Sequence, residues 1–319
     1  MNSFFSEFTS LKYVIKKSKR ILLFAHSGPD SDTIGSVLAL GEYFSYLGKD
    51  FEVACFDEVP ISLKQISKRE FKHPSKMDIT SFDVVIACDS VERGFDKIFN
   101  NLSQNQVIVL IDHHPDISLK GDINIIDPSY SSVCEIVYAF FRAKKIDITK
   151  DMATFLMLGI LWDTGMFQHA NTTPEVIGIA SELMKRGAPT NKIVNLIFSN
   201  KKLETLKLWG KAFEKAKVNS KNGMIATALT KKDVEDCHAS TEDIAQVAAI
   251  LNTVPGAKFS LILYEKDDSI IKGSLRSEDY KGVDVSKIAH ELGGGGHRLA
   301  SGFEIKGKIK ETENGWEIV

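Results

Sequence analysis

Continuous runs of apolar, β-branched residues constrain the fold of this chain more than any other feature. Three such runs cover residues 20–26, 83–89 and 106–112. Runs of this kind form strands that are buried on both faces of a parallel sheet. Residues 33–47 have the pattern of a helix that ends at Gly48, and 51–55 is a further short strand. We therefore predict an α/β domain with a mostly parallel sheet flanked by helices.

The pattern changes in the second half, and 319 residues are more than one domain usually needs. Thr173 and Pro174 open a helix that Gly187 closes. The later expected elements are strands at 223–229, 259–264, 269–276 and 302–305 and helices at 243–251 and 285–292. We predict a first domain at 1–190, a helical linker at 191–217 and a smaller α/β domain with a mixed sheet at 218–319. The active-site cleft is expected between the two domains.

Composition excludes several classes of protein. The net charge of −2 argues against a protein that wraps long nucleic acid, but a small phosphorylated substrate remains compatible with it. No apolar run approaches the roughly 18–20 residues that span a bilayer, and the N-terminus lacks a secretory pattern. The cysteines are scattered and form no CxxC pair: Cys55, Cys88, Cys134 and Cys237. We predict a cytoplasmic protein with reduced thiols and no membrane partner.

Acids and histidines stand where the predicted strands end. The set comprises His26, Asp30, Asp32, Asp89, Asp112, His113, His114 and Asp163. Because ligands gather outside the carboxyl ends of strands in an open α/β sheet, we expect one cluster at that edge. A helix cap or a turn explains any single aspartate equally well. The combination favours a metal site, since buried charges must pair or bind metal.

The ligand types indicate which metal. Carboxylate oxygens with one or two imidazoles suit Mn²⁺ or a similar hard divalent ion better than zinc. Four carboxylates carry four negative charges, which two divalent cations cancel, so that a phosphate can approach. We therefore predict two Mn²⁺ ions, with Mg²⁺ or Co²⁺ as substitutes.

The motifs resemble those of the DHH phosphoesterase superfamily. The HxxPDxDxxGS pattern from His26 to Ser36, the following Asp89, the triplet 112–114 and the Asp-Thr-Gly at Asp163 occur in the family's order. The stretch 293–298, Gly-Gly-Gly-Gly-His-Arg, resembles the signature of the DHH-associated C-terminal domain. The compact pairing of the two domains is similar to the branch of nano-RNases and pAp phosphatases.

This resemblance implies a role for each residue of the set. One Mn²⁺ would be held by His26, Asp30 and Asp89, and the other by Asp32, Asp89, His113 and Asp163. His114 would contact the scissile phosphate, and Asp112 would orient a histidine. Many relatives carry an asparagine shortly after the triplet, where this chain has Pro115, Asp116 and Ile117. His169 lies close to Asp163 in sequence and either lines the site or supports it.

The C-terminal domain carries the expected substrate contacts. A glycine run alone is better explained as a loop or helix cap, but followed by His297 and Arg298 it can form an anion-binding nest. Taken alone, Arg276 would be interpreted as a surface arginine. It precedes the glycine run as in the family pattern, however, and could bind a phosphate through two N–H donors. By resemblance the substrate-binding residues are Arg276, Ser277, Gly294, Gly295, Gly296, His297 and Arg298.

The implied activity is hydrolysis of short oligonucleotides (nanoRNA) to 5′-mononucleotides and of pAp to AMP and phosphate. A phosphodiesterase for linear or cyclic dinucleotides shares every metal ligand and stays open. A RecJ-like single-strand exonuclease would need a further nucleic-acid-binding domain, and a non-catalytic nucleotide sensor would be expected to lack metal ligands. The expected partners are short single strands or nucleotide bisphosphates and not long duplex DNA; a homodimer stays open.

Overall fold

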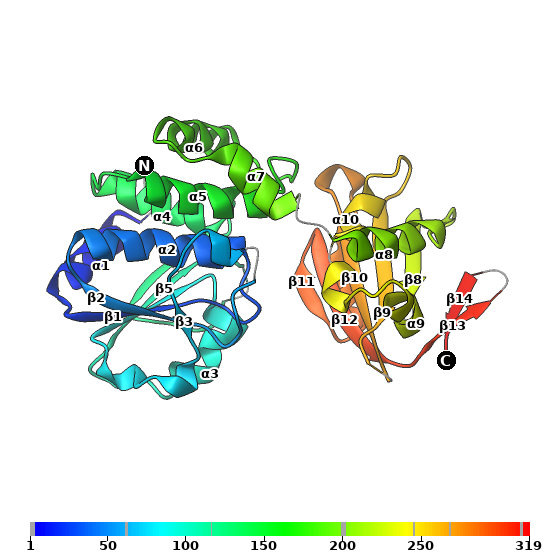
Figure 1. Cartoon of the computed structure of the whole chain (residues 1–319), viewed down its shortest axis with the longest axis horizontal. Coiled ribbons are helices and arrows are strands. Elements are labelled where there is room, and N and C mark those ends of the chain that lie inside the picture. Colours follow the sequence, from blue (N-terminus) through cyan, green and yellow to red (C-terminus); the bar gives the residue numbers. More distant parts are fainter. Residues whose placement is uncertain are drawn as a thin grey trace. The chain divides into compact units, whose positions relative to one another are not determined.

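The computed structural model describes residues 4–60, 63–115, 117–198, 202–244, 246–267, 269–312 and 315–319. The chain divides into two compact units, residues 1–200 and 201–319 (Figure 1). The segment expected as a linker is helical in its described parts. Its first helix, α7 (Thr190–Phe198), belongs to the first unit, and α8 (Leu203–Glu214) belongs to the second.

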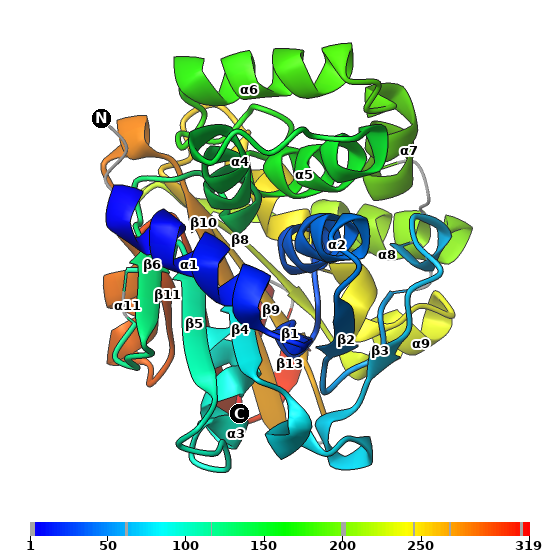
Figure 2. The same cartoon turned by 90° about the vertical axis from the view of Figure 1, so that its left-hand side faces the viewer.

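The first unit is built on a six-stranded sheet in which all neighbouring strands are parallel. Figure 2 shows the strands side by side in the order β3-β2-β1-β4-β5-β6. Their bounds are β1 Arg20–Phe24, β2 Asp50–Ala54, β3 Phe71–Lys72, β4 Val84–Cys88, β5 Val107–Asp112 and β6 Ile123–Ile126. The predicted parallel sheet is therefore confirmed, and the strand order reverses between β1 and β4.

Helices cover both faces of this sheet, as the buried β-branched runs require. In Figure 1, α2, α4 and α5 lie on one face and α3 on the other. The larger apolar core joins side chains such as Ile21, Leu23 and Ile86 to the first group of helices, and a smaller core joins Leu22 and Phe24 to the opposite face. The helices are α1 Phe5–Lys17, α2 Ser31–Tyr46, α3 Asp96–Phe99, α4 Val133–Ala143, α5 Lys150–Asp163, α6 Pro174–Lys185 and α7.

The second unit holds a mixed six-stranded sheet in the order β11-β12-β10-β9-β8-β7 and a separate hairpin, β13–β14. Only β8 and β9 pair in parallel within that sheet. The strands are β7 Lys217–Asn219, β8 Met224–Leu229, β9 Phe259–Glu265, β10 Ile270–Ser277, β11 Gly295–His297, β12 Ala300–Lys306, β13 Ile309–Thr312 and β14 Gly315–Ile318. The helices are α8, α9 Lys231–Asp236, α10 Val247–Asn252 and α11 Val285–Glu291.

Two general expectations can be compared with this fold. No helix in the described part of the chain is long and apolar enough to cross a bilayer. All four cysteines lie within the described ranges, where each is buried and carries a free thiol.

Candidate metal centre

The six predicted metal ligands converge at the carboxyl edge of the first sheet. His26 follows β1, Asp89 follows β4 and His113 follows β5, so three of them come from neighbouring strand ends. The point where the strand order reverses is the usual ligand position in such sheets. Asp163 departs from this pattern, because it is the last residue of helix α5. The remaining two, Asp30 and Asp32, lie at the start of α2.

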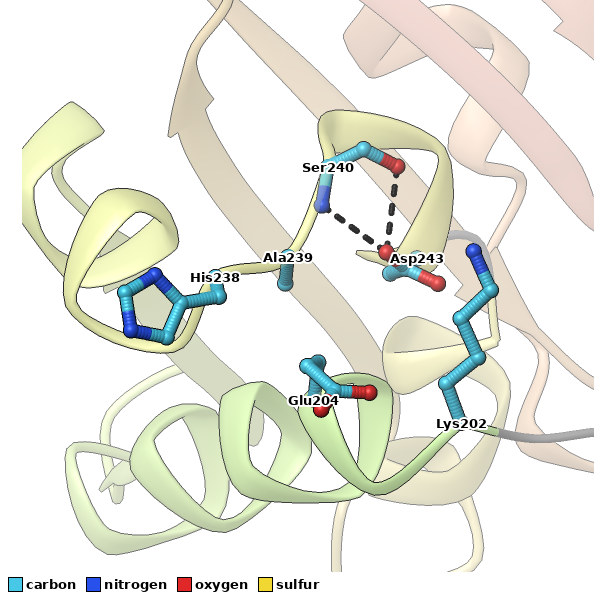
Figure 3. A pocket seen from close by; sticks show the side chains of 6 residues that line it. All are labelled: Lys202, Glu204, His238, Ala239, Ser240 and Asp243. Carbon is cyan, nitrogen blue, oxygen red and sulfur yellow. Dashed lines mark hydrogen bonds between the residues drawn. The ribbon is translucent and has the colours of Figure 1, made fainter.

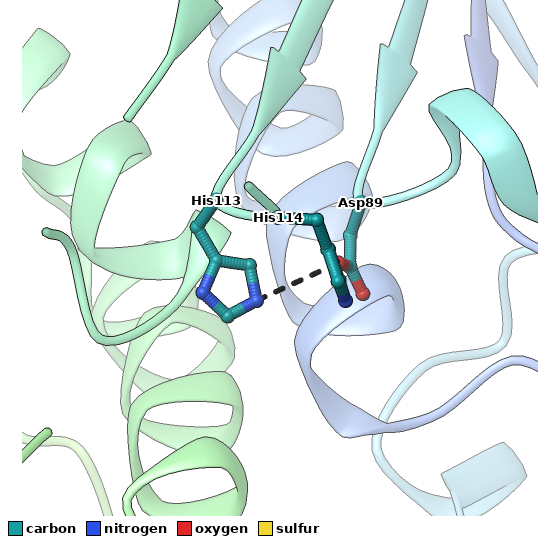
Figure 4. A group of neighbouring side chains, drawn as sticks. All are labelled: Asp89, His113 and His114. Carbon is teal, nitrogen blue, oxygen red and sulfur yellow. Dashed lines mark ion pairs between the residues drawn. The ribbon is translucent and has the colours of Figure 1, made fainter. Parts of the chain in front are cut away.

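Asp89 is the centre of the cluster. Its Oδ2 lies 3.4 Å from His26 Nε2, while its Oδ1 lies 3.8 Å from His113 Nε2 and 3.4 Å from His114 Nδ1 (Figure 4). The carboxylate is 3% exposed, and its backbone has a φ of 55°, a left-handed conformation that costs energy outside glycine. Its two oxygens therefore face two different sets of side chains, as a bridging ligand requires.

The first set is His26, Asp30 and Asp89, each with one ligand atom within 4.8 Å of the others. His26 Nε2 lies 3.2 Å from Asp30 Oδ2. His26 Nδ1 lies 2.8 Å from the carbonyl of Ser27, to which it can only donate, so Nε2 is the ring nitrogen that faces the carboxylates. Asp30 also caps α2, since its Oδ1 accepts from the backbone N–H groups of Asp32 and Thr33.

The second set is Asp32, His113 and Asp163, and a third grouping joins Asp89 with His113 and His114. His113 Nε2 lies 3.4 Å from Asp163 Oδ2. Both oxygens of Asp32 are held by the N-terminal turn of α4, where the N–H groups of Val133 and Cys134 donate at 2.7 and 2.9 Å. Such donors fix a carboxylate in one orientation and favour its ionised form.

The charges of the cluster are not balanced by protein alone. Burial, reinforced by the neighbouring aspartates, raises the pKa of Asp89 and of Asp163 well above the ordinary value. Burial also raises the pKa of Asp32. Burial acts the same way on Asp30, but the neighbouring imidazole of His26 outweighs it and lowers the pKa to about 2.

Buried atoms without partners test whether a cation fits here. Within the described ranges, His26 Nε2, Asp89 Oδ1 and Asp163 Oδ2 are buried and accept or donate no hydrogen bond. Each is a potential ligand atom, and an unpaired buried group of this kind is costly. A pair of divalent cations would satisfy all three and neutralise the carboxylates, so the residues fit two hard metal ions.

Asp112 and His114 form a pair beside the cluster. Asp112 Oδ1 accepts from His114 Nδ1 at 2.7 Å and from its backbone N–H at 3.0 Å. Burial raises the pKa of Asp112, but the bond to His114 outweighs it and the net direction is down, so Asp112 is an ionised acceptor. The pair has the geometry expected of a carboxylate that fixes the tautomer and orientation of an imidazole.

Arg93 is a neighbour of the cluster that the sequence analysis did not identify. It lies in an irregular turn, Val91–Phe95, that begins two residues after Asp89, and its Nη1 lies 3.8 Å from Asp30 Oδ2. An arginine in an irregular turn gives no periodic signal. Its position four residues after a predicted strand-end ligand is the feature that could have drawn attention to it.

His169 supports the loop after Asp163, since its Nδ1 lies 2.9 Å from the carbonyl of Asp163. Asn171, also missed in the sequence, donates to that carbonyl at 3.2 Å. Asp116 lies outside the described residues.

The predicted substrate residues occupy adjacent segments of the second unit. Arg276 ends β10 opposite Ala300 of β12, and β12 is also the partner of β11, which contains His297. Within the described residues, the Arg276 guanidinium donates to the carbonyl of Leu275 at 2.9 Å and has no carboxylate within 4 Å, and burial lowers its pKa. An arginine stays protonated in such a setting, so Arg276 is a half-buried, uncompensated cation.

The other polar residues of this set differ in their surroundings. Arg298 Nη1 lies 2.9 Å from Asp279 Oδ1, and both side chains are exposed. Ser277 is buried, and its hydroxyl donates to the carbonyl of Lys258, so its structural role is already clear.

The glycine run is explained in large part by the fold. The N–H groups of Gly293 and Gly294 donate to carbonyls of α11, which makes them the C-terminal cap of that helix. A Cβ at Gly294 would lie 2.1 Å from the carbonyl oxygen of Gly302, and one at Gly296 would lie 2.7 Å from that of Ala300. The expected anion nest therefore lacks the Gly294 N–H as a donor, while Gly295 and Gly296 form an edge strand.

A polar hollow of about 380 Å³ in the second unit contains none of these residues (Figure 3). It is lined by Lys202, Glu204, His238, Ala239, Ser240 and Asp243. Its central carboxylate, Asp243, already accepts from Ser240 and from Thr205. The polar groups around Asp243 are therefore already hydrogen-bonded to one another.

Each of the two units matches a known protein family. Residues 20–160 match the model of the DHH family, N-terminal domain, and residues 221–314 match the DHHA1 domain. Proteins named bifunctional oligoribonuclease and PAP phosphatase NrnA are similar over most of the chain. The one from Thermus thermophilus is 29% identical, covering 90% of this chain and 84% of the relative, and the one from Bacillus subtilis is 28% identical, covering 93% of each.

A solved structure gives the same result for the fold. The crystal structure of an exopolyphosphatase-related protein from Bacteroides fragilis superimposes with a TM-score of 0.87 at 25% identity. The match covers 94% of this chain and 91% of that protein.

Proposed function

This chain is a DHH-family phosphoesterase with a DHHA1 domain, and we propose that it hydrolyses short oligonucleotides to 5′-mononucleotides and pAp to AMP and phosphate. The observation that carries the proposal is the carboxylate of Asp89, which groups with His26 and Asp30 on one side and with His113 and His114 on the other. The cluster also contains three unpartnered buried atoms. The relatives named oligoribonuclease and PAP phosphatase, similar over nine-tenths of the chain, support this choice of substrate.

We assign two Mn²⁺ ions to the cluster. His26, Asp30 and Asp89 would hold one ion, and Asp32, Asp89, His113 and Asp163 would hold the other. When bound, such a pair lowers the pKa of a shared water and stabilises charge on the phosphate and its leaving oxygen. Mg²⁺ and Co²⁺ share enough of this chemistry to serve as substitutes.

The protein's own groups position the ligands and the substrate. The N-terminal turn of α4 orients Asp32, and the Ser27 carbonyl holds the tautomer of His26. We assign His114 to the scissile phosphate, where its imidazole would steady an oxygen or supply a proton to the leaving group. Asp112 would keep that ring in place.

The second unit would bind the part of the substrate that does not react. Arg276 is the best candidate for its second phosphate, because it is a half-buried cation without a carboxylate partner among the described residues. His297 and Arg298, at the end of the glycine run, would add further donors. Contacts to only a few groups suit a dinucleotide or a nucleotide bisphosphate better than a long strand.

Product analysis with purified protein and Mn²⁺ tests the proposal. The panel is pAp, a linear dinucleotide, a cyclic dinucleotide and a long single strand, with Asp89→Asn protein as the inactive control. Rapid turnover of pAp and the linear dinucleotide, with little on the long strand, is the expected result. A preference for the cyclic compound or the long strand would overturn the substrate assignment while keeping the metal centre.

A further inference from the structure

The backbone of Arg93 is anchored on both sides to loops of the metal centre. Its carbonyl accepts from the N–H of Ser27, which follows His26, at 2.8 Å, and its own N–H donates to the carbonyl of Ser90 at 3.1 Å. The neighbouring Glu92 accepts from the N–H and hydroxyl of Ser118, both at 2.6 Å. The turn that carries Arg93 is therefore fixed relative to the predicted ligands.

The guanidinium of Arg93 is held much less firmly than its backbone. Its side chain is 44% exposed, and the 3.8 Å from Nη1 to Asp30 Oδ2 is longer than a hydrogen bond. Among the described residues, no other carboxylate lies within 4 Å of this guanidinium. A firmly bound charge pair would have closed to about 2.8 Å, so this contact leaves donors of the guanidinium for another acceptor.

Exposure places Arg93 at the open side of the first ligand set. His26 is fully buried and the Asp89 side chain is 3% exposed, whereas that of Asp30, next to Arg93, is 21% exposed. A phosphate that approaches this set from solvent would therefore meet the guanidinium. Arginine binds phosphate through parallel N–H donors and stabilises charge on its oxygens.

A purely structural role, in which Arg93 neutralises Asp30, explains the geometry less well. Asp30 Oδ2 already faces His26 Nε2 at 3.2 Å and is a predicted ligand atom. A cation whose task was to pair with that oxygen would compete with a bound metal ion. A cation that serves the substrate has no such conflict.

We propose that Arg93 is a catalytic residue whose guanidinium contacts a non-bridging oxygen of the scissile phosphate and stabilises the charge that develops there. The inference rests on the proposed function, because it presupposes a phosphoester at the metal centre. It adds a cation to the contacts of the scissile phosphate, to which only His114 was assigned so far.

The test compares Arg93→Met and Arg93→Lys with a matched control, Arg142→Met. Arg142 is an exposed arginine of the same unit whose Nη1 pairs with Glu182 Oε1 at 3.2 Å. Three quantities are measured: kcat on an aryl phosphodiester with Mn²⁺, the dissociation constant for Mn²⁺, and the dissociation constant of the Mn²⁺-loaded protein for inorganic phosphate. Thermal unfolding confirms that each variant is folded.

Removal of one transition-state donor typically lowers kcat by about 10²–10³-fold, and we expect that loss in Arg93→Met. Arg93→Lys should recover part of it, phosphate should bind more weakly to both variants, and Mn²⁺ should bind Arg93→Met as tightly as the wild type or more tightly. Unchanged kcat and phosphate binding, or a parallel loss of Mn²⁺ affinity and kcat, would overturn the proposal. If the wild type hydrolyses no phosphoester, the proposed function fails, and phosphate binding still decides whether Arg93 is an anion contact.

Discussion

Gly159 provides the sharpest test of how the metal centre is supported. It lies in α5 where that helix passes α2, and a Cβ there would lie 2.4 Å from Asp32 Oδ1 and 2.3 Å from Cys134 Sγ. Real Cβ atoms do not approach other atoms so closely, so Gly159→Ala must displace the Asp32 carboxylate or the helix. Asp32 is held by two backbone N–H groups of α4, and its displacement would cost those bonds as well.

The magnitude follows from two opposing effects. Overpacking a buried position costs about 1–3 kcal/mol, and two contacts this short favour the upper end. Replacing glycine by alanine inside a helix returns about 0.5–1 kcal/mol. The net destabilisation is thus about 2 kcal/mol, or about 4–8 °C in Tm for a unit of this size. Because the moved residue is a predicted ligand, Mn²⁺ affinity should fall by at least about tenfold.

Thermal unfolding and Mn²⁺ titration calorimetry measure both effects, with Gly178→Ala as the matched control. Gly178 also lies inside a helix, α6, but nothing lies within 4 Å of a Cβ at that position. The control should be slightly stabilised and should bind Mn²⁺ like the wild type. A Gly159→Ala protein with wild-type Tm and wild-type Mn²⁺ affinity would refute the placement of Asp32 against α5.

Three further predictions concern the same site and its substrate. Asp89→Asn should bind neither Mn²⁺ ion tightly and lose activity on every phosphoester; near-normal turnover would disprove a bridging carboxylate. Arg276→Met should raise KM for pAp by about tenfold or more but leave kcat on an aryl phosphodiester intact, and equal losses on both substrates would show a role in the chemistry or the fold. Burial and mutual repulsion raise the pKa of Asp89 and Asp163 in the folded protein. A chelator-treated protein is therefore more stable while these carboxyls are protonated. Its stability falls as the pH rises above their pKa in the unfolded chain, which is near 4. Mn²⁺ binding should instead strengthen with pH, because the ligands must release protons. Calorimetry across a pH series tests this, since an Mn²⁺ affinity that stops rising above about pH 5 would show that these carboxyls titrate normally.

The sequence predicts the first unit well because its signal is periodic. Buried strands must be apolar along their whole length, so β1, β4 and β5 appear as continuous runs, and the ligands at their ends follow from the parallel topology. The short strand β3 and the helix α4 lack a continuous run of this kind and were not assigned. Asp163 was identified from its motif, although it ends a helix rather than a strand.

The second unit shows where a local pattern is ambiguous. A glycine run fits a loop, a nest or a cap, and only the pairing of β11 with β12 shows why Gly294 and Gly296 must lack a Cβ. The helix expected at 243–251 is interrupted in the structure, where a short turn ends at Ile244 and α10 begins at Val247. The need for glycine depends on strand pairing, which no local periodicity records.

The left-handed backbone of Asp89 explains how one carboxylate can face two groups of predicted ligands. A chain that continued in extended form past Cys88 would direct the carboxylate to one side of the sheet edge. The left-handed conformation at φ 55° instead lets one oxygen face His26 and the other face the histidines after β5. Asparagine tolerates this conformation as aspartate does, whereas alanine does not. Asp89→Asn therefore keeps the turn and removes only the charge, so that its effect on metal binding measures the carboxylate rather than the backbone.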